Sequence, residues 1–159
     1  MKIIFKVLTL LASGVQAAKN GKCRVLAFSS GDESAAYQAG ALKGFTTSSH
    51  MKPEDYAYDS VSGISGGAIN AVLLANYTKG EEGAAADSME RFWTAATKTS
   101  LYKNWFGGIT RGLFFEGGLY NSAPMEDFLK AQMADVSMKR KLDIGIVDVK
   151  DGSYRDFSE

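Results

Sequence analysis

The most constraining feature of the chain is the pentapeptide Gly-Ile-Ser-Gly-Gly at residues 63–67, which places Ser65 between glycines. Residues 58–62, before it, have the composition of a strand, and residues 68–75, after it, are mostly apolar and predict a helix. A serine at a sharp turn from strand to helix has the sequence surroundings of a nucleophile elbow. The alternative is a glycine-rich turn that only allows a strand and a helix to pack.

The residue types around Ser65 suit a catalytic nucleophile. Gly63, Gly66 and Gly67 lack side chains, so the strand and the helix can approach closely around a strained backbone. The serine would also lie at the amino end of a helix, where unpaired backbone N–H groups stabilise the oxyanion of an acyl transfer. We predict Ser65 as the nucleophile and the Gly66 N–H as the first donor to the oxyanion.

The chain restricts how this serine is activated. A Ser-His-Asp triad needs a histidine, and His50, in a polar stretch ahead of Ser65, is the only one. In α/β-hydrolases the histidine follows the serine, so we expect His50 to be an exposed loop residue. A Ser-Asp dyad, in which a carboxylate accepts the hydroxyl proton directly, is the economical alternative.

From Val25 to Leu74 the sequence resembles the patatin-like phospholipases. The resemblance rests on a first strand, the helix after a glycine loop, an elbow and a later segment, at Leu26–Ser29, Ala36–Leu42, Tyr58–Asn70 and Gly118–Met125. It implies an α/β fold with a parallel-rich sheet and helices on both faces, and hydrolysis of phospholipid or acyl-lipid esters at a membrane surface. It implies no metal and no organic cofactor.

The oxyanion loop departs from the family pattern. Where the family usually has G-G-G-x-[KR]-G, residues 30–35 read Ser-Gly-Asp-Glu-Ser-Ala and keep only the middle glycine, Gly31. Oxyanion holes use backbone N–H groups, and aspartate is among the residues least penalised at positive φ. The resemblance therefore implies Gly31 and Asp32 as donors beside Gly66. The alternative is that Asp32 or Ser34 caps the helix that follows.

The family's catalytic aspartate lies in a D-G-[GA] motif well downstream of the serine. Asp151-Gly152-Ser153 is the nearest match, but residues 142–157 predict a strand, a tight turn and a returning strand. We therefore expect Asp151 to be a turn residue. The expectation is a domain truncated on its C-terminal side, with the catalytic aspartate beyond Glu159.

Residues 1–17 predict a secretory signal peptide, with Lys2, an apolar stretch interrupted by Lys6, and small residues ending at Ala17. An uncleaved anchor is the alternative, and residues 18–159 would be the partial patatin-like domain, secreted or in the endomembrane lumen.

Removing the two lysines of the signal peptide takes eighteen basic residues to sixteen, beside eighteen acidic ones. This balance does not indicate nucleic-acid binding. One histidine and one cysteine do not support a zinc site, and we expect Cys23 to be a buried small hydrophobe.

The remaining elements follow from periodicity. Strands near residues 23–29, 57–62 and 141–149 alternate with helices, which indicates an α/β sheet whose carboxyl edge binds ligands. Residues 81–98 predict a helix that buries Ala85, Met89, Phe92, Trp93 and Ala96, and Ser122 is the predicted cap of another helix. Residues 101–118 are rich in aromatics and glycines. Composition favours a loop that holds these aromatics in the core over a mobile lid that meets lipid.

Together these features predict a serine acyl hydrolase of the lipase or phospholipase type, with a Ser-Asp dyad. A lipid-binding or interaction protein that has lost catalysis is the alternative, because the glycine loop is eroded and the aspartate is missing. A related acyltransferase or thioesterase built on the same elbow remains open.

Overall fold

The computed structural model describes residues 23–116 and 118–159, so the predicted signal peptide lies outside the described residues. The chain forms two compact units. The first runs to Met89 and resumes at Ser137, and the second spans Glu90–Val136. No helix in the described part of the chain is both long enough and apolar enough to cross a membrane.

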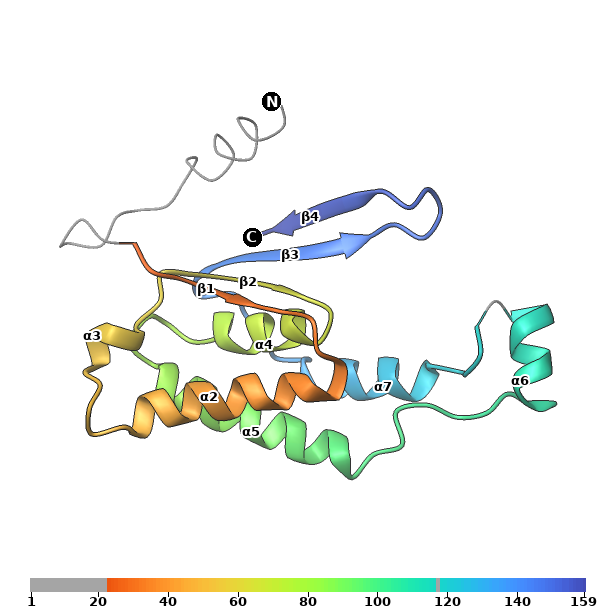
Figure 1. Cartoon of the computed structure of the whole chain (residues 1–159), viewed down its shortest axis with the longest axis horizontal. Coiled ribbons are helices and arrows are strands. Elements are labelled where there is room, and N and C mark those ends of the chain that lie inside the picture. Colours follow the sequence, from red (N-terminus) through yellow and green to blue (C-terminus); the bar gives the residue numbers. More distant parts are fainter. Residues whose placement is uncertain (1–22, 117) are drawn as a thin grey trace. The chain divides into compact units, whose positions relative to one another are not determined.

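A four-stranded sheet organises the first unit, in the order β1-β2-β3-β4 (Figure 1). Its strands are β1 (Val25–Phe28), β2 (Ser60–Ile64), β3 (Lys141–Val147) and β4 (Tyr154–Ser158). The first three strands are parallel and β4 is antiparallel to β3. The predicted α/β class with a mostly parallel sheet is confirmed.

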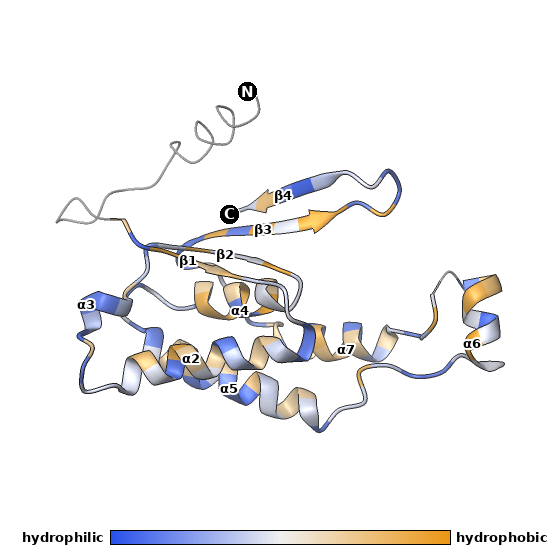
Figure 2. Ribbon diagram, viewed as in Figure 1, coloured by the Kyte–Doolittle hydropathy of each residue, from blue (hydrophilic) through white to orange (hydrophobic). Residues whose placement is uncertain are grey.

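The helices of this unit are α2 (Ala35–Thr47), α3 (Pro53–Tyr56), α4 (Gly66–Ala75) and the first part of α5 (Glu82–Thr97). Helix α4 packs on one face of the sheet, against β1, β2 and β3, and α2 packs against α4 on the same side (Figure 1). Helix α4 is mostly hydrophobic (Figure 2) because it is covered by the sheet on one side and by other helices on the other. The core is made of alternate strand residues and inward-facing helix residues, among them Phe28, Val61, Leu142, Leu42, Leu74 and Met89.

A buried ion pair ties the amino ends of β2 and β3 to α5. Arg140 Nη1 lies 2.7 Å from Glu82 Oε1, and both side chains are almost fully buried. The guanidinium also donates to the carbonyl oxygens of Tyr58, Tyr77 and Thr78. Burying two charges is costly unless they are paired and hydrogen-bonded, and this cluster meets both conditions.

The second unit contains the rest of α5, α6 (Gly108–Arg111), η2 (Gly112–Glu116) and α7 (Ala123–Gln132). The ring of Phe92 lies 5.3 Å from that of Trp93 and 5.2 Å from that of Phe128, between ring centroids. The predicted apolar face of α5 is confirmed, with Trp93 half-buried and the other four residues buried.

The predicted cap of α7 is wrong in one detail. Ser122 is the N-cap residue but its side chain makes no capping hydrogen bond. Asn121 Oδ1 accepts from the Ala123 N–H instead, at 2.9 Å. Both residue types are good caps. Asn121 takes the role because an isolated antiparallel bridge with Lys103 fixes its backbone beside the start of the helix.

Candidate active site

Ser65 occupies a sharp turn between β2 and α4. Its backbone has φ 57° and ψ −128°, a combination that L-residues adopt only under strain. The residue is exposed, whereas Gly66 and Gly67, which follow it, are buried. The strained turn therefore places Ser65 directly after the carboxyl end of β2, where it is exposed to solvent and accessible to a substrate.

The turn leaves no room for a side chain at Gly63. A Cβ placed there would lie 2.6 Å from the Gly67 carbonyl carbon and 2.8 Å from the Ala68 nitrogen. The Ala68 N–H donates to the Ser65 carbonyl oxygen at 2.9 Å, which closes the first turn after the serine. Glycine at this position is thus required by the close approach of β2 and α4.

The loop after β1 leads into the short 3-10 helix η1 (Asp32–Ser34). Asp32 has φ 44°, and with Ser65 it forms the pair of non-glycine residues at positive φ among those described. Neither Asp32 nor Ser34 makes a side-chain capping hydrogen bond at η1 or α2. The capping alternative is therefore wrong, and the Asp32 backbone adopts the left-handed conformation that a glycine would favour.

The loop and the elbow meet in the structure. The parallel register sets Phe28 opposite Gly63, so the ends of β1 and β2 are neighbours. A Cβ built on Gly66 would lie 2.8 Å from the Asp32 carbonyl oxygen and 2.9 Å from Ala35 Cβ. The Asp32 backbone thus lies against the first residue of α4. Gly31, Asp32, Ser65 and Gly66 are brought to one place at the carboxyl edge of the sheet.

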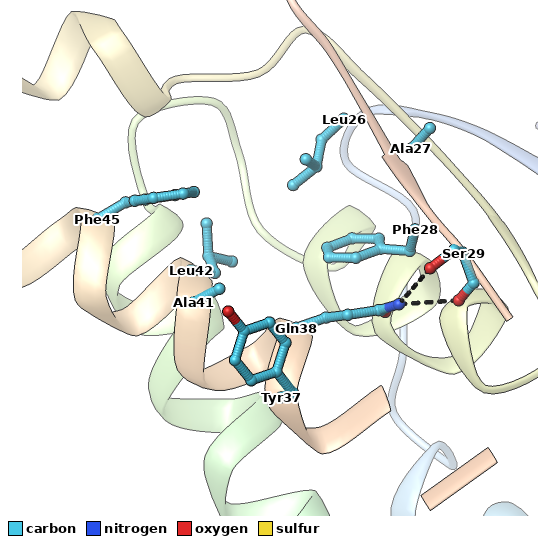
Figure 3. Close-up of a pocket in the computed structure, with 9 residues that line it drawn as sticks. All are labelled: Leu26, Ala27, Phe28, Ser29, Tyr37, Gln38, Ala41, Leu42 and Phe45. Carbon is cyan, nitrogen blue, oxygen red and sulfur yellow. Dashed lines mark hydrogen bonds between the residues drawn. The ribbon is translucent and has the colours of Figure 1, made fainter. Parts of the chain in front are cut away.

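A hydrogen-bond network that the sequence analysis missed supports this arrangement. Asn70 is buried in α4, and its Nδ2 donates to Ala35 O and to Gln38 Oε1, both at 2.9 Å. Gln38 Nε2 in turn donates to the carbonyl oxygen of Ser29 at 2.9 Å and to its hydroxyl oxygen at 3.0 Å (Figure 3). The network joins α4, α2 and the end of β1. The available signal was Asn70 itself, a polar residue in an apolar helix.

Comparison with known families agrees with this geometry. The family model described as patatin-like phospholipase matches residues 26–152. The chain belongs to the patatin-like phospholipase family. No match is found among the curated proteins. Membership indicates lipid acyl hydrolase activity and lipid substrates, and the matched range contains both the predicted oxyanion loop and the turn at Ser65.

An apolar cleft of about 200 Å³ lies between β1 and α2 in the patatin-like unit (Figure 3). Its lining residues are Leu26, Ala27, Phe28, Ser29, Tyr37, Gln38, Ala41, Leu42 and Phe45. Ser65 is not among them, so the cleft is adjacent to the Ser29–Gln38 hydrogen bonds rather than to the candidate nucleophile.

Asp151, the nearest match to the patatin-like aspartate motif, lies in the turn between β3 and β4. Its Oδ1 accepts from the Ser153 N–H at 2.8 Å, and Oδ2 lies 3.5 Å from Arg155 Nη2. The hydrogen bonds from Ser153 hold the pKa of Asp151 below its usual value, which makes the carboxylate a weaker base. The predicted hairpin is confirmed, with β3 and β4 pairing from Asp143–Ser158 to Val147–Tyr154.

His50 and Cys23, the single histidine and the single cysteine of the chain, are not part of the candidate site. His50 is an exposed residue in the turn after α2, as predicted. Cys23 is exposed, so the expectation of a buried position is wrong. It lies two residues before β1, an edge strand of the sheet. Among residues 23–116 and 118–159 no three potential ligand side chains cluster in a way that suits a metal ion.

Proposed function

We propose that the protein is a serine acyl hydrolase that cleaves lipid esters, with Ser65 as the nucleophile. The observation that carries the proposal is the strained backbone of Ser65 at the head of α4, with Gly66 packed against Asp32. Enzymes keep such strain where it presents a reacting group, and a helix amino end beside a second loop suits a developing oxyanion. The proposed substrates are phospholipids or neutral acyl lipids.

In the proposed reaction, Ser65 Oγ forms a bond to the acyl carbonyl carbon while its proton passes to an aspartate carboxylate. The carbonyl oxygen becomes an oxyanion that accepts from the backbone N–H groups of Gly66, Asp32 and Gly31. The tetrahedral intermediate then breaks its ester C–O bond, and the leaving alcohol takes the proton. Water hydrolyses the acyl-serine by the same steps, which releases a fatty acid and restores Ser65.

The base of this dyad is proposed to be an aspartate beyond residue 159. Asp148 and Asp151, in the β3–β4 turn, are both engaged with Arg155, at 2.9 and 3.5 Å. For Asp151, the hydrogen bonds from Ser153 also hold the pKa below its usual value, which makes that carboxylate a poor proton acceptor. We propose in addition that residues 1–17 direct the protein into the secretory pathway.

The direct test is hydrolysis of a soluble short-chain ester and of phosphatidylcholine by the full-length protein. Ser65→Ala is expected to abolish both activities. Ser62→Ala, which removes the same hydroxyl three positions earlier on β2, is expected to retain them, because Ser62 precedes the elbow. Full activity in Ser65→Ala would contradict the proposal.

The second candidate function is lipid binding without catalysis. It is favoured by one observation, the presence of Asp32 at φ 44° where a glycine would be unstrained. A full-length protein that binds phospholipid vesicles but releases no fatty acid, with or without Ser65, would support this candidate over the hydrolase.

A further inference from the structure

Large apolar side chains are exposed along Tyr102–Tyr120 in the second unit, a segment that we call the aromatic loop and that is described except at residue 117. The exposed fraction is 95% for Phe106, 80% for Phe115 and 73% for Phe114. The interpretation that these aromatics are held in the core is therefore wrong for all three. Soluble proteins seldom leave several neighbouring large apolar side chains in water without a partner for them.

Hydrogen bonds join the two ends of the aromatic loop and also connect residues within it. Lys103 and Asn121 exchange backbone hydrogen bonds of 3.1 and 2.9 Å in an antiparallel bridge. Within the loop, Trp105 Nε1 donates to Gly118 O at 2.9 Å, and the Gly118 N–H donates to Gly112 O at 3.2 Å. Trp105 is therefore half-buried as an internal brace, and the phenylalanines are left on the outside of a defined loop.

The positions of the exposed side chains follow from this bracing. Gly112 is buried, and a Cβ there would lie 2.7 Å from Trp105 Cδ1 and 2.8 Å from the Leu119 carbonyl oxygen. With Gly112 fixed against Trp105, the next residues, Leu113, Phe114 and Phe115, extend into solvent. Figure 2 shows hydrophobic residues along the α6 and η2 segment.

The charge of the aromatic loop points to one kind of partner. The aromatic loop contains two basic residues, Lys103 and Arg111, and one acidic residue, Glu116, and a further lysine, Lys98, lies four positions before it. Glu116 is paired with Arg111 at 2.8 Å, which leaves Lys103 and the nearby Lys98 as the exposed cations beside the aromatic side chains. Exposed aromatics beside unopposed lysines match an anionic membrane surface, where rings enter the boundary between headgroups and acyl chains and lysines meet the phosphates.

We propose that the aromatic loop is a membrane-docking surface that inserts Phe106, Phe114 and Phe115 into the interface of an anionic bilayer. The inference rests on the proposed function in that a lipid hydrolase must reach a substrate held in a membrane. Its test does not require catalysis. The other possible occupants of this surface, a second copy of the chain or another protein, are outcomes of the same test.

The experiment measures co-sedimentation of the full-length Ser65→Ala protein with vesicles of phosphatidylcholine, with or without phosphatidylglycerol. Phosphatidylglycerol is expected to increase binding. The double variant Phe114→Ser/Phe115→Ser is expected to bind at least about tenfold more weakly, and Lys103→Gln about fivefold more weakly. Phe106→Ser is a second apolar variant. Val149→Ser is the matched control, because Val149 is also 95% exposed but lies in the β3–β4 turn of the first unit.

Three results would overturn the inference. The first is unchanged vesicle binding in the double variant and in Phe106→Ser, with circular dichroism spectra like that of the parent. The second is an equal loss of binding in Val149→Ser. The third is a dimer that the double variant converts to monomer while vesicle binding stays the same, which would assign the surface to a second copy.

The loop variants, made again with Ser65 in place, distinguish a failure of the docking surface from a failure of the proposed hydrolase function. Hydrolysis of a soluble ester together with loop-independent vesicle binding would contradict the docking surface alone. Loop-dependent vesicle binding without ester hydrolysis would contradict the hydrolase alone.

Discussion

Asn70 Nδ2 donates to Gln38 Oε1 at 2.9 Å, and this bond joins the helix after Ser65 to the helix after the oxyanion loop. The same amide also donates to Ala35 O at 2.9 Å. Through Gln38 the connection continues to Ser29, at the end of β1. The two segments that form the candidate site are therefore held together by hydrogen bonds of the Asn70 and Gln38 side chains.

Asn70→Ala is expected to lower the free energy of unfolding by about 1–3 kcal/mol, because it leaves the buried Ala35 carbonyl and the half-buried Gln38 amide oxygen without their donor. It is also expected to lower kcat, since the Asp32 backbone is no longer fixed against Gly66. Urea unfolding measures the first effect and hydrolysis of a soluble ester the second. Asn104→Ala, at an exposed position, is the control. An unfolding midpoint equal to that of the parent protein would show that the network does not hold the site.

Asp32→Gly and Asp32→Val test the conformation of the oxyanion loop. Glycine adopts φ 44° without strain, so Asp32→Gly should raise the unfolding midpoint and keep or increase kcat. Valine is strongly penalised there, and Asp32→Val should cost about 1–3 kcal/mol of stability and most of the activity. A stable and active Asp32→Val protein would contradict a left-handed Asp32.

The Glu82–Arg140 pair should behave as a buried ion pair. Arg140→Met leaves the Glu82 carboxylate buried without its partner, and a loss of about 3–5 kcal/mol in unfolding free energy is expected. Glu82→Leu/Arg140→Met, which removes both charges, should recover part of that loss. Lys130→Met, which breaks the exposed pair with Glu126, should leave the thermal midpoint nearly unchanged. Similar midpoints for Arg140→Met and Lys130→Met would contradict this role.

The lowered pKa of Asp59 should make the free energy of unfolding depend on pH. Burial of its carboxyl acts to raise the pKa of Asp59, but hydrogen bonds from Arg24 N at 3.0 Å and Lys79 Nζ at 2.5 Å outweigh it, so the pKa is lowered. A group with a lowered folded pKa contributes stability above its unfolded pKa of about 3.9, and the contribution is lost as pH falls through the folded pKa. The stability difference between the parent and Asp59→Asn should therefore be largest near neutral pH and shrink below about pH 4. A difference that stays constant between these pH values would exclude this linkage.

The parts of the fold that depend on nearby residues were predictable from the sequence. The turn at Ser65 needs glycines at neighbouring positions, and β1, β2, α4 and α5 follow from short apolar patterns, so the elbow and the mostly parallel sheet were anticipated. The hairpin at Asp151 was anticipated for the same reason, because a D-G turn between two apolar runs is a local signal.

The features that depend on distant partners were not predictable. Arg140 and Glu82 are 58 positions apart and Asn70 and Gln38 are 32 apart, and no periodic pattern links such residues. Asn121 rather than Ser122 caps α7 because of a bridge to Lys103, 18 positions earlier. The exposure of Phe106 was missed because composition says that an aromatic is apolar but not whether another element covers it.

Intact-mass detection of labelling by a fluorophosphonate shows whether Ser65 is an activated nucleophile. One added phosphonyl group is expected on the full-length protein and on Ser62→Ala, and none on Ser65→Ala. Labelling that persists in Ser65→Ala, or a folded full-length protein that takes no label, would show that Ser65 is not the activated nucleophile.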